Sequence, residues 1–172
     1  MSEAPISYYN WMSSMGKLLL VCDAAGLRAI RFEGREKFSP PQPGWRYEDE
    51  PFREVMKQLE EYFAGDRVAF NVPLAPPGTS FQLQVWEALQ KIPYGETLSY
   101  AELARRIDKP RAVRAVGAAN GANPIPIIIP CHRVIGSNGS LVGYGGGLDI
   151  KKTLLALEQE QRAKTLPQAS LF

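Results

Sequence analysis

The sequence is poor in cysteine and histidine. It has two cysteines, Cys22 and Cys131, and one histidine among 172 residues. Two thiols far apart in the chain do not form a disulfide framework and fit a reducing compartment. Together with one imidazole they are also too few for a structural zinc site, which needs four ligands. The sequence therefore predicts free thiols and no metal.

Excess charge and long hydrophobic runs are also lacking. Twenty Lys and Arg against 18 Asp and Glu leave a net charge of +2, so any contact with nucleic acid has to come from local clustering. The longest apolar runs, such as residues 18–21 and 127–129, are far shorter than a membrane span. Near the start, Glu3 interrupts any signal-peptide pattern. We expect a cytoplasmic protein that contacts no membrane.

The N-terminal part has the pattern of a small sheet with one helix. Residues 15–22 and 27–32 are apolar stretches separated by a turn-like cluster, which predicts a β-hairpin. Residues 51–64 carry apolar side chains at helical spacing, with a proline at the start and a glycine after the end. Residues 68–74 then alternate as in a strand.

The following stretch, PLAPPG at residues 73–78, interrupts regular structure and predicts a domain linker. We therefore divide the chain into an N-terminal domain, residues 1–74, and a C-terminal domain, residues 75–172.

The C-terminal part begins with two capping signals. Thr79 with Gln82 matches a capping box and predicts a helix that ends near Pro93. Ser99 with Glu102 repeats this spacing and predicts a second helix to about residue 107. A short turn and a third helix, residues 111–122, complete a predicted helix-turn-helix.

The third helix lacks the polar side chains that read bases in a major groove. Arg114 is surrounded by small residues, namely Ala112, Ala115, Gly117 and Ala119. Such a face permits close approach to DNA, where one inserted cation fills a gap in the base stack. Tight helix packing inside a core is the alternative.

The segment before Cys131 contains Pro124, Pro126 and Pro130, which exclude a helix and predict a buried, extended chain. Cys131 is followed by His132 and by the positive charge of Arg133, a setting that lowers the pKa of a thiol. Neighbouring side chains of an extended segment point to opposite sides, so we expect a water-bridged contact between the thiol and the imidazole. Cys22, within an apolar strand, is expected to be an ordinary core residue.

Residues 136–147 contain six glycines with Tyr144 among them. Such a loop brings backbone amides close to a flat ligand, or else is an ordinary surface loop. A last amphipathic helix, residue 148 to about residue 162, carries Glu158.

Together these motifs resemble a known family. The string Pro130-Cys131-His132-Arg133, preceded by Asn123-Pro124 and followed by residues 143–146, is similar to the active-site signature of the methylated-DNA-protein-cysteine methyltransferases, or O6-alkylguanine-DNA alkyltransferases. The resemblance extends over residues 79–158 and includes Tyr100 and Arg114. It implies an α/β (α+β) fold with a small ribonuclease H-like N-terminal domain of sheet and helix. The C-terminal domain is then mostly helical, with a winged-helix-like helix-turn-helix.

The resemblance also implies a partner and a way to reach the lesion. The partner is double-stranded DNA containing alkylated guanine, which rotates out of the duplex so that the alkyl group becomes accessible. Arg114 takes the place of the rotated base, and Ala112, Ala115 and Gly117 allow the helix to approach. No cofactor and no obligate protein partner is implied. Several members of the family hold a structural zinc in the N-terminal domain, but this sequence lacks such cysteine and histidine ligands, so we expect no metal.

In the chemistry that the resemblance implies, Cys131 is the nucleophile and the permanent alkyl acceptor, so each molecule reacts once. His132 deprotonates the thiol through a water molecule and Glu158 orients His132. Tyr100 protonates the departing guanine and Asn123 supports the site by hydrogen bonding. The backbone of Val134 and the residues Tyr144, Gly145 and Gly146 line the base pocket.

Two other functions are compatible with parts of the sequence. A non-catalytic binder of DNA or of lesions accounts for the helix-turn-helix, residues 99–122, but leaves the thiol unexplained. A thiol hydrolase would use Cys131 and His132, but would turn over repeatedly without nucleic acid.

Overall fold

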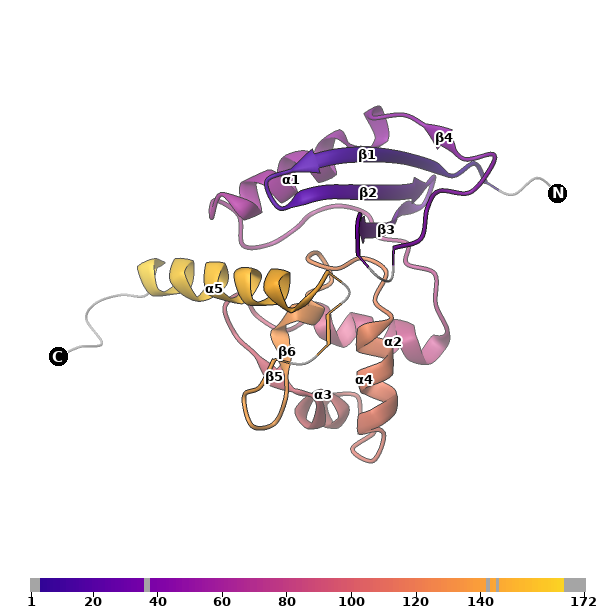
Figure 1. Ribbon diagram of the computed structural model, residues 1–172. Helices are drawn as coiled ribbons and strands as arrows, with labels where there is room; N and C mark the ends of the chain where they lie inside the picture. The colour runs from indigo at the N-terminus through magenta and orange to yellow at the C-terminus, as the bar shows by residue number, and fades with distance from the viewer. Residues whose placement is uncertain (1–3, 36–37, 142, 145, 166–172) are drawn as a thin grey trace.

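The computed structural model describes residues 4–35, 38–141, 143–144 and 146–165. In Figure 1 a sheet with one helix lies above a group of helices, and the last helix, α5, runs between the two layers. The fold is mixed α/β, as predicted.

The N-terminal part is built on one four-stranded sheet. Its strands are β1 (Ser7–Ser13), β2 (Gly16–Asp23), β3 (Gly26–Phe32) and β4 (Arg46–Tyr47), in the order β3-β2-β1-β4. The pairs β1–β2 and β2–β3 are antiparallel, and β4 pairs in parallel with β1. The hairpin predicted for residues 15–22 and 27–32 is confirmed as β2 and β3.

The central strand β2 is buried on both sides. Leu18 and Leu20 point into the main core, while Leu19 and Val21 point to the opposite face, against a smaller apolar cluster. The helix expected at residues 51–64 is present as a 3₁₀ turn (Glu50–Phe52) followed by α1 (Arg53–Phe63).

The prediction of a strand at residues 68–74 is wrong. The chain there has no regular structure and makes one isolated bridge, between Leu27 and Leu74. At this edge of β3, Leu27 N donates to Pro73 O at 2.9 Å, and Ala75 N donates to Leu27 O at 2.7 Å. Since Pro73 has no N–H to donate, the pairing does not extend into a ladder.

The C-terminal part contains four α-helices and one short parallel strand pair in the described residues. The helices are α2 (Ser80–Gln90), α3 (Tyr100–Arg106), α4 (Val113–Gly121) and α5 (Leu148–Thr165), and β5 (Leu98–Ser99) pairs with β6 (Val134–Ile135).

Both capping signals mark real helix starts. Thr79 and Gln82 form the full reciprocal capping box of α2, and Ser99 accepts from Glu102 N at the start of α3. The predicted helix-turn-helix is confirmed as α3 and α4. None of the described helices is long and apolar enough to cross a membrane.

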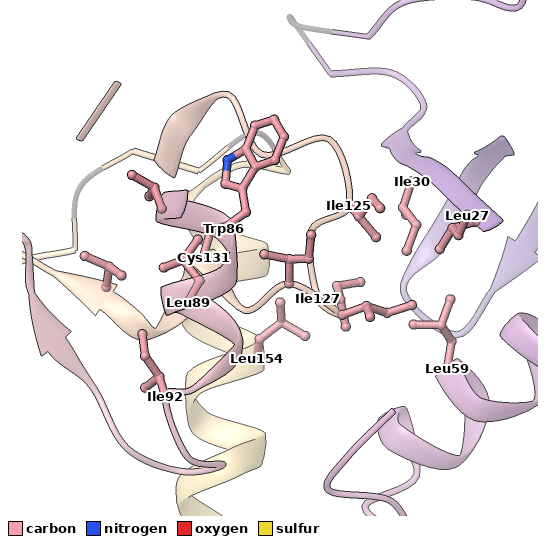
Figure 2. Packing of buried hydrophobic residues seen from close by; sticks show 14 of the residues in the cluster. Leu27, Ile30, Leu59, Trp86, Leu89, Ile92, Ile125, Ile127, Cys131 and Leu154 are labelled. Atoms are coloured by element: carbon pink, nitrogen blue, oxygen red, sulfur yellow. The ribbon is translucent and has the colours of Figure 1, made fainter. Parts of the chain in front are cut away.

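One hydrophobic core joins the two parts. Figure 2 shows Leu27, Ile30 and Leu59 from the N-terminal part facing side chains of the C-terminal part across Ile125 and Ile127. The backbones also meet, since Ile30 N donates to Pro124 O at 2.9 Å. The segment that leads to Cys131 is thus packed between the sheet and the helices.

Candidate active site

Cys131 begins a short 3₁₀ helix, Cys131–Arg133, that follows a buried loop without regular structure. No helix forms across the prolines, as predicted, but the loop is folded back rather than extended. Ile129 N donates to Ile125 O at 3.0 Å, and Ile127 has a positive φ of 77°. The expectation that Cys131 and His132 lie on opposite sides of an extended chain is therefore wrong, because the backbone turns at these residues.

Asn123 holds this loop in shape. Its Nδ2 donates to Ile129 O at 2.8 Å, and its Oδ1 accepts from Ile125 N at 3.0 Å. A further hydrogen bond from the Asn123 side chain to the thiol favours the ionised form of Cys131. One amide thus binds both the backbone before the thiol and the thiol itself.

His132 and Glu158 are in direct contact although neither is exposed to solvent. Both side chains are fully buried, and His132 Nε2 lies 2.6 Å from Glu158 Oε2. His132 Nδ1 is buried without a hydrogen-bond partner among the described residues. The imidazole therefore has one ring nitrogen bound to the carboxylate and the other available for chemistry.

Protonation states follow from the neighbours. Burial opposes ionisation of Glu158, but hydrogen bonds from His132 and Arg133 outweigh it and lower the carboxyl pKa to about 2. Burial lowers the pKa of His132, and it outweighs the opposite effect of the Glu158 carboxylate. At neutral pH the pair is an ionised carboxylate and a neutral imidazole. Nε2 then carries the proton that it donates, and Nδ1 has the free lone pair.

The pKa of Cys131 is raised, whereas the sequence predicted that it would be lowered. The side chain is 5% exposed, and burial raises the pKa of the thiol from 9.0 to about 11, although Asn123 and the positive charge of Lys151 partly counteract this. Arg133 does not lower it, because its guanidinium binds Glu158: Nε donates to Oε1 at 2.8 Å and Nη2 to Oε2 at 3.0 Å. Cys131 is thus a protonated thiol that needs a base.

A cavity of about 410 Å³ opens at Cys131. Asn123, Pro126 and Tyr144 contribute to its wall on the C-terminal side, and Ile30 is among the residues of β3 that line it on the other side. The Tyr144 hydroxyl is buried without a hydrogen-bond partner among the described residues.

Two of the residues expected to line a base pocket, Val134 and Gly146, are buried next to this cavity rather than in its wall. Val134 is fully buried, and its carbonyl accepts from Lys151 Nζ at 2.7 Å. Gly146 packs so closely against Phe32 that an added Cβ would lie 2.9 Å from the ring. Gly145 lies outside the described residues.

Tyr100 lies at the start of α3, close enough to Cys131 for an electrostatic effect between the two. Burial raises the pKa of Tyr100 above its usual 10, and the charge of Cys131 acts in the same direction. The hydroxyl is therefore protonated at neutral pH, as a proton donor must be.

Helix α4 presents the small-residue face only in part. Arg114 and Ala115 are exposed, and Ala112 and Gly117 are half-buried. Ala119 does not belong to this face: it is 3% exposed, and its carbonyl accepts from Trp86 Nε1 at 2.8 Å. The exposed part of the helix therefore offers one cation among small side chains, while its other side packs in the core.

Two polar residues near the thiol were not found from the sequence. Asn120 is 4% exposed on the core side of α4, and its side chain hydrogen-bonds Tyr100. Lys151 is fully buried, lowers the pKa of Cys131 and binds the Val134 carbonyl. The signal was present in α5, since Lys151 and Glu158 share helical spacing with Leu154 and both interrupt its apolar side.

Comparison with protein families covers nearly the whole chain. The family model of the ribonuclease-like domain of 6-O-methylguanine DNA methyltransferase matches residues 6–76. The model of the DNA binding domain of 6-O-methylguanine DNA methyltransferase matches residues 80–160.

Individual relatives agree with these matches. A methylated-DNA–protein-cysteine methyltransferase of Methanosarcina acetivorans is 53% identical over 152 residues, which cover 88% of this chain and 97% of the relative. The crystal structure of Mycobacterium tuberculosis O6-methylguanine methyltransferase is 44% identical with a TM-score of 0.85, covering 97% of this chain and 99% of that one. The M. tuberculosis OGT in complex with DNA is 45% identical with a TM-score of 0.84, covering 90% and 94%.

Proposed function

Because this chain belongs to the 6-O-methylguanine DNA methyltransferase family, we propose that it repairs duplex DNA by transferring the alkyl group of O6-alkylguanine to Cys131. The observation that carries this proposal is a buried thiol in the wall of a cavity, followed in the chain by a buried imidazole that has one ring nitrogen bound to a carboxylate. Two buried, free cysteines fit the reducing cytoplasm, where we place the reaction.

The proposed reaction begins with the base. His132 Nδ1 takes the proton of the Cys131 thiol through a water molecule, and Glu158 stabilises the imidazolium that forms. The sulfur then attacks the alkyl carbon, so that a C–S bond forms as the C–O6 bond breaks. The electron pair moves to the guanine, which accepts a proton from the Tyr100 hydroxyl.

The raised pKa of Cys131 explains why the reaction requires His132 and Glu158. A thiol with a pKa of about 11 is almost fully protonated at neutral pH, and the thiolate is the nucleophile. His132 therefore has to generate the thiolate. The product is a thioether, a far poorer leaving group than guanine, so we expect each molecule to react once.

The lesion reaches the thiol by base flipping. An alkyl group on a stacked guanine is inaccessible to a buried sulfur, whereas a rotated base can enter the cavity beside Tyr144. In the proposed complex α4 approaches the DNA, with Ala112, Ala115 and Gly117 close to the backbone. Arg114 fills the space that the base leaves.

Intact-protein mass spectrometry tests this function. After incubation with a duplex that contains O6-methylguanine, the full chain should gain the mass of one methyl group, and repair should stop at one equivalent. Peptide mapping should place the methyl on Cys131. The matched control is Cys22→Ala, which removes the other buried thiol and should still accept one methyl. Transfer that survives Cys131→Ala, or repeated turnover, would contradict the proposal.

A further inference from the structure

We infer that Tyr62, a residue of the N-terminal part, is a positioning residue for alkyl transfer that acts through Glu158 on His132. This inference rests on the proposed function and adds to it a role for the sheet-and-helix region. Tyr62 lies in the penultimate position of α1, and α1 and α5 lie on the same side of the molecule (Figure 1).

The geometry places the hydroxyl on the carboxylate. Tyr62 is fully buried, and its OH donates to Glu158 Oε2 at 2.5 Å. The same oxygen lies 2.6 Å from His132 Nε2 and accepts from Arg133 Nη2 at 3.0 Å. Three side chains therefore converge on Oε2, and one of them comes from the other part of the protein.

The second oxygen is held by groups of the C-terminal part. Arg133 Nε donates to Oε1 at 2.8 Å and Gly95 N donates to Oε1 at 3.1 Å. Oε1 thus has its own partners, and Tyr62 is the donor from the N-terminal part on Oε2, the oxygen that faces His132.

The tyrosine can only donate in this contact. Burial raises the pKa of the Tyr62 hydroxyl, and the negative charge of Glu158 raises it further, so the hydroxyl stays protonated. A buried hydroxyl that gives up its partner loses a hydrogen bond to a charged group, which is among the stronger hydrogen bonds in proteins. The contact therefore holds the carboxylate at one place and in one charge state.

The ring of Tyr62 is fixed independently of its hydroxyl. It packs against Phe70 with ring centroids 5.4 Å apart and edge-on against Tyr94 at 6.2 Å. The Arg133 guanidinium lies over the Tyr94 ring, 5.6 Å from its centroid. Replacing Tyr62 by phenylalanine therefore removes one hydroxyl and leaves the packing in place.

Loss of the Tyr62 hydroxyl should change the pKa of the His132 imidazole as well as its position. With one donor fewer, Oε2 is a stronger acceptor for the His132 ring, which raises the pKa of the imidazole. Since His132 acts as a base only when neutral, the acidic limb of the pH–rate profile should move to higher pH. The charged or titratable groups around this pair are Arg133, Lys151, Cys131, Tyr62, Tyr94 and Tyr144.

Single-turnover rates of Tyr62→Phe test the inference. Free O6-benzylguanine and a duplex with O6-methylguanine would both be used as alkyl donors, from mildly acidic to mildly alkaline pH. We expect the rate on both donors to fall about tenfold to a hundredfold, the range that corresponds to one hydrogen bond to a charged group. The acidic limb should shift to higher pH on both.

Tyr94→Phe is the matched control, because the Tyr94 hydroxyl is also buried but has no hydrogen-bond partner among the described residues. This variant should keep the wild-type rate and pH profile. In a Glu158→Gln background, Tyr62→Phe should cause little further loss, since residues that act as one unit are non-additive. Thermal unfolding of each variant gives the effect on stability separately.

The outcomes separate this inference from the function on which it rests. A Tyr62→Phe protein with a wild-type rate and pH profile, in a chain that needs His132 and Glu158, overturns the inference alone. Equal effects of Tyr62→Phe and Tyr94→Phe also overturn it. A wild-type chain that accepts no alkyl group, or a His132→Gln chain that reacts normally, overturns both.

Discussion

The Arg133 guanidinium binds Glu158 through two of its nitrogens and not the thiol of Cys131, two positions before it. The third nitrogen of the guanidinium, Nη1, donates to Ile92 O at 2.7 Å, so all three nitrogens of Arg133 have a partner. The positive charge that follows the cysteine in sequence is therefore committed to the carboxylate that orients His132. In the proposed reaction, activation of the thiol therefore depends on His132.

Arg114→Ala should slow the repair of duplex DNA much more than the reaction with free O6-benzylguanine, because the free base needs no flipping. Unstacking costs a few kcal/mol, so losing the group that fills the gap should reduce the duplex rate about tenfold to a hundredfold. Arg53→Ala, which removes an exposed arginine of α1, is the control for charge. Equal losses on both substrates would place Arg114 in the fold or the cavity instead.

The free energy of unfolding should decrease as the pH is lowered, and His132 should account for most of this decrease near neutral pH. Burial lowers the pKa of His132 in the folded state, so the unfolded chain binds a proton that the folded chain does not. The imidazole thus stabilises the fold above its unfolded pKa of about 6.5, and this contribution is lost as pH falls, by up to about 1.4 kcal/mol per pH unit. Glu158 acts in the same direction at lower pH, between 4.5 and about 2.

Urea denaturation between about pH 5 and pH 7.5 measures this slope, since histidine is the side chain whose ordinary pKa lies in that window. The chain has one histidine, so His132→Gln should remove most of the pH dependence there. Identical slopes in the wild-type protein and the variant would show that the folded protein binds the proton as readily as the unfolded chain.

Asn123→Ala should reduce both stability and alkyl transfer, because the amide binds the loop at Ile125 and Ile129 and also the thiol. Leaving two buried backbone groups unpaired should lower the free energy of unfolding by about 2–4 kcal/mol. Asn138→Ala is the matched control, since Asn138 accepts a single exposed hydrogen bond from Ser140 N at 3.0 Å. Denaturation and single-turnover rates would be compared. A fully stable Asn123→Ala protein would mean that the loop is held by its packing alone.

Gly146→Ala should destabilise the protein through Phe32 of β3. The added methyl would lie 2.9 Å from the ring, and overpacking of this kind costs about 1–3 kcal/mol. Phe32→Leu in the same chain should recover part of that loss, which a double-mutant cycle measures as coupling. Gly121→Ala is the control, because no atom outside its chain neighbours and its own helix backbone lies within 4 Å of the added Cβ. Additive effects would mean that the loop moves away from the strand at no cost.

Local signals explain what could be predicted from the sequence. The starts of α2 and α3 were found because an N-cap signal lies within four residues, as a full capping box at α2 and as the Ser99 cap alone at α3. The hairpin of β2 and β3 was found because its apolar runs flank a turn. β1 was missed, since its run of mixed tyrosine, tryptophan, serine and asparagine has no clear alternation. The strand at residues 68–74 was wrongly predicted because pairing depends on which backbone groups β3 offers.

Contacts between residues far apart in the sequence account for the features of the site that the sequence did not predict. The signature around Cys131 predicts the nucleophile of the proposed reaction, but the binding of Arg133 to Glu158 depends on how α5 packs. Tyr62 and Glu158 are 96 positions apart, and no local pattern on α1 distinguishes this buried tyrosine from an ordinary core aromatic. Burial, which raises the thiol pKa, is likewise a property of the packed molecule.

The shared core has a consequence for the two regions that the family models match. Ile125 and Ile127 contact the sheet on one side and the helices on the other (Figure 2), so separating the regions at residues 77–79 would expose apolar surface on both. The C-terminal region alone would also lose the donor that Tyr62 provides. We therefore expect the two regions to unfold together, and we expect that neither can be exchanged for an unrelated module without redesigning the surface between them.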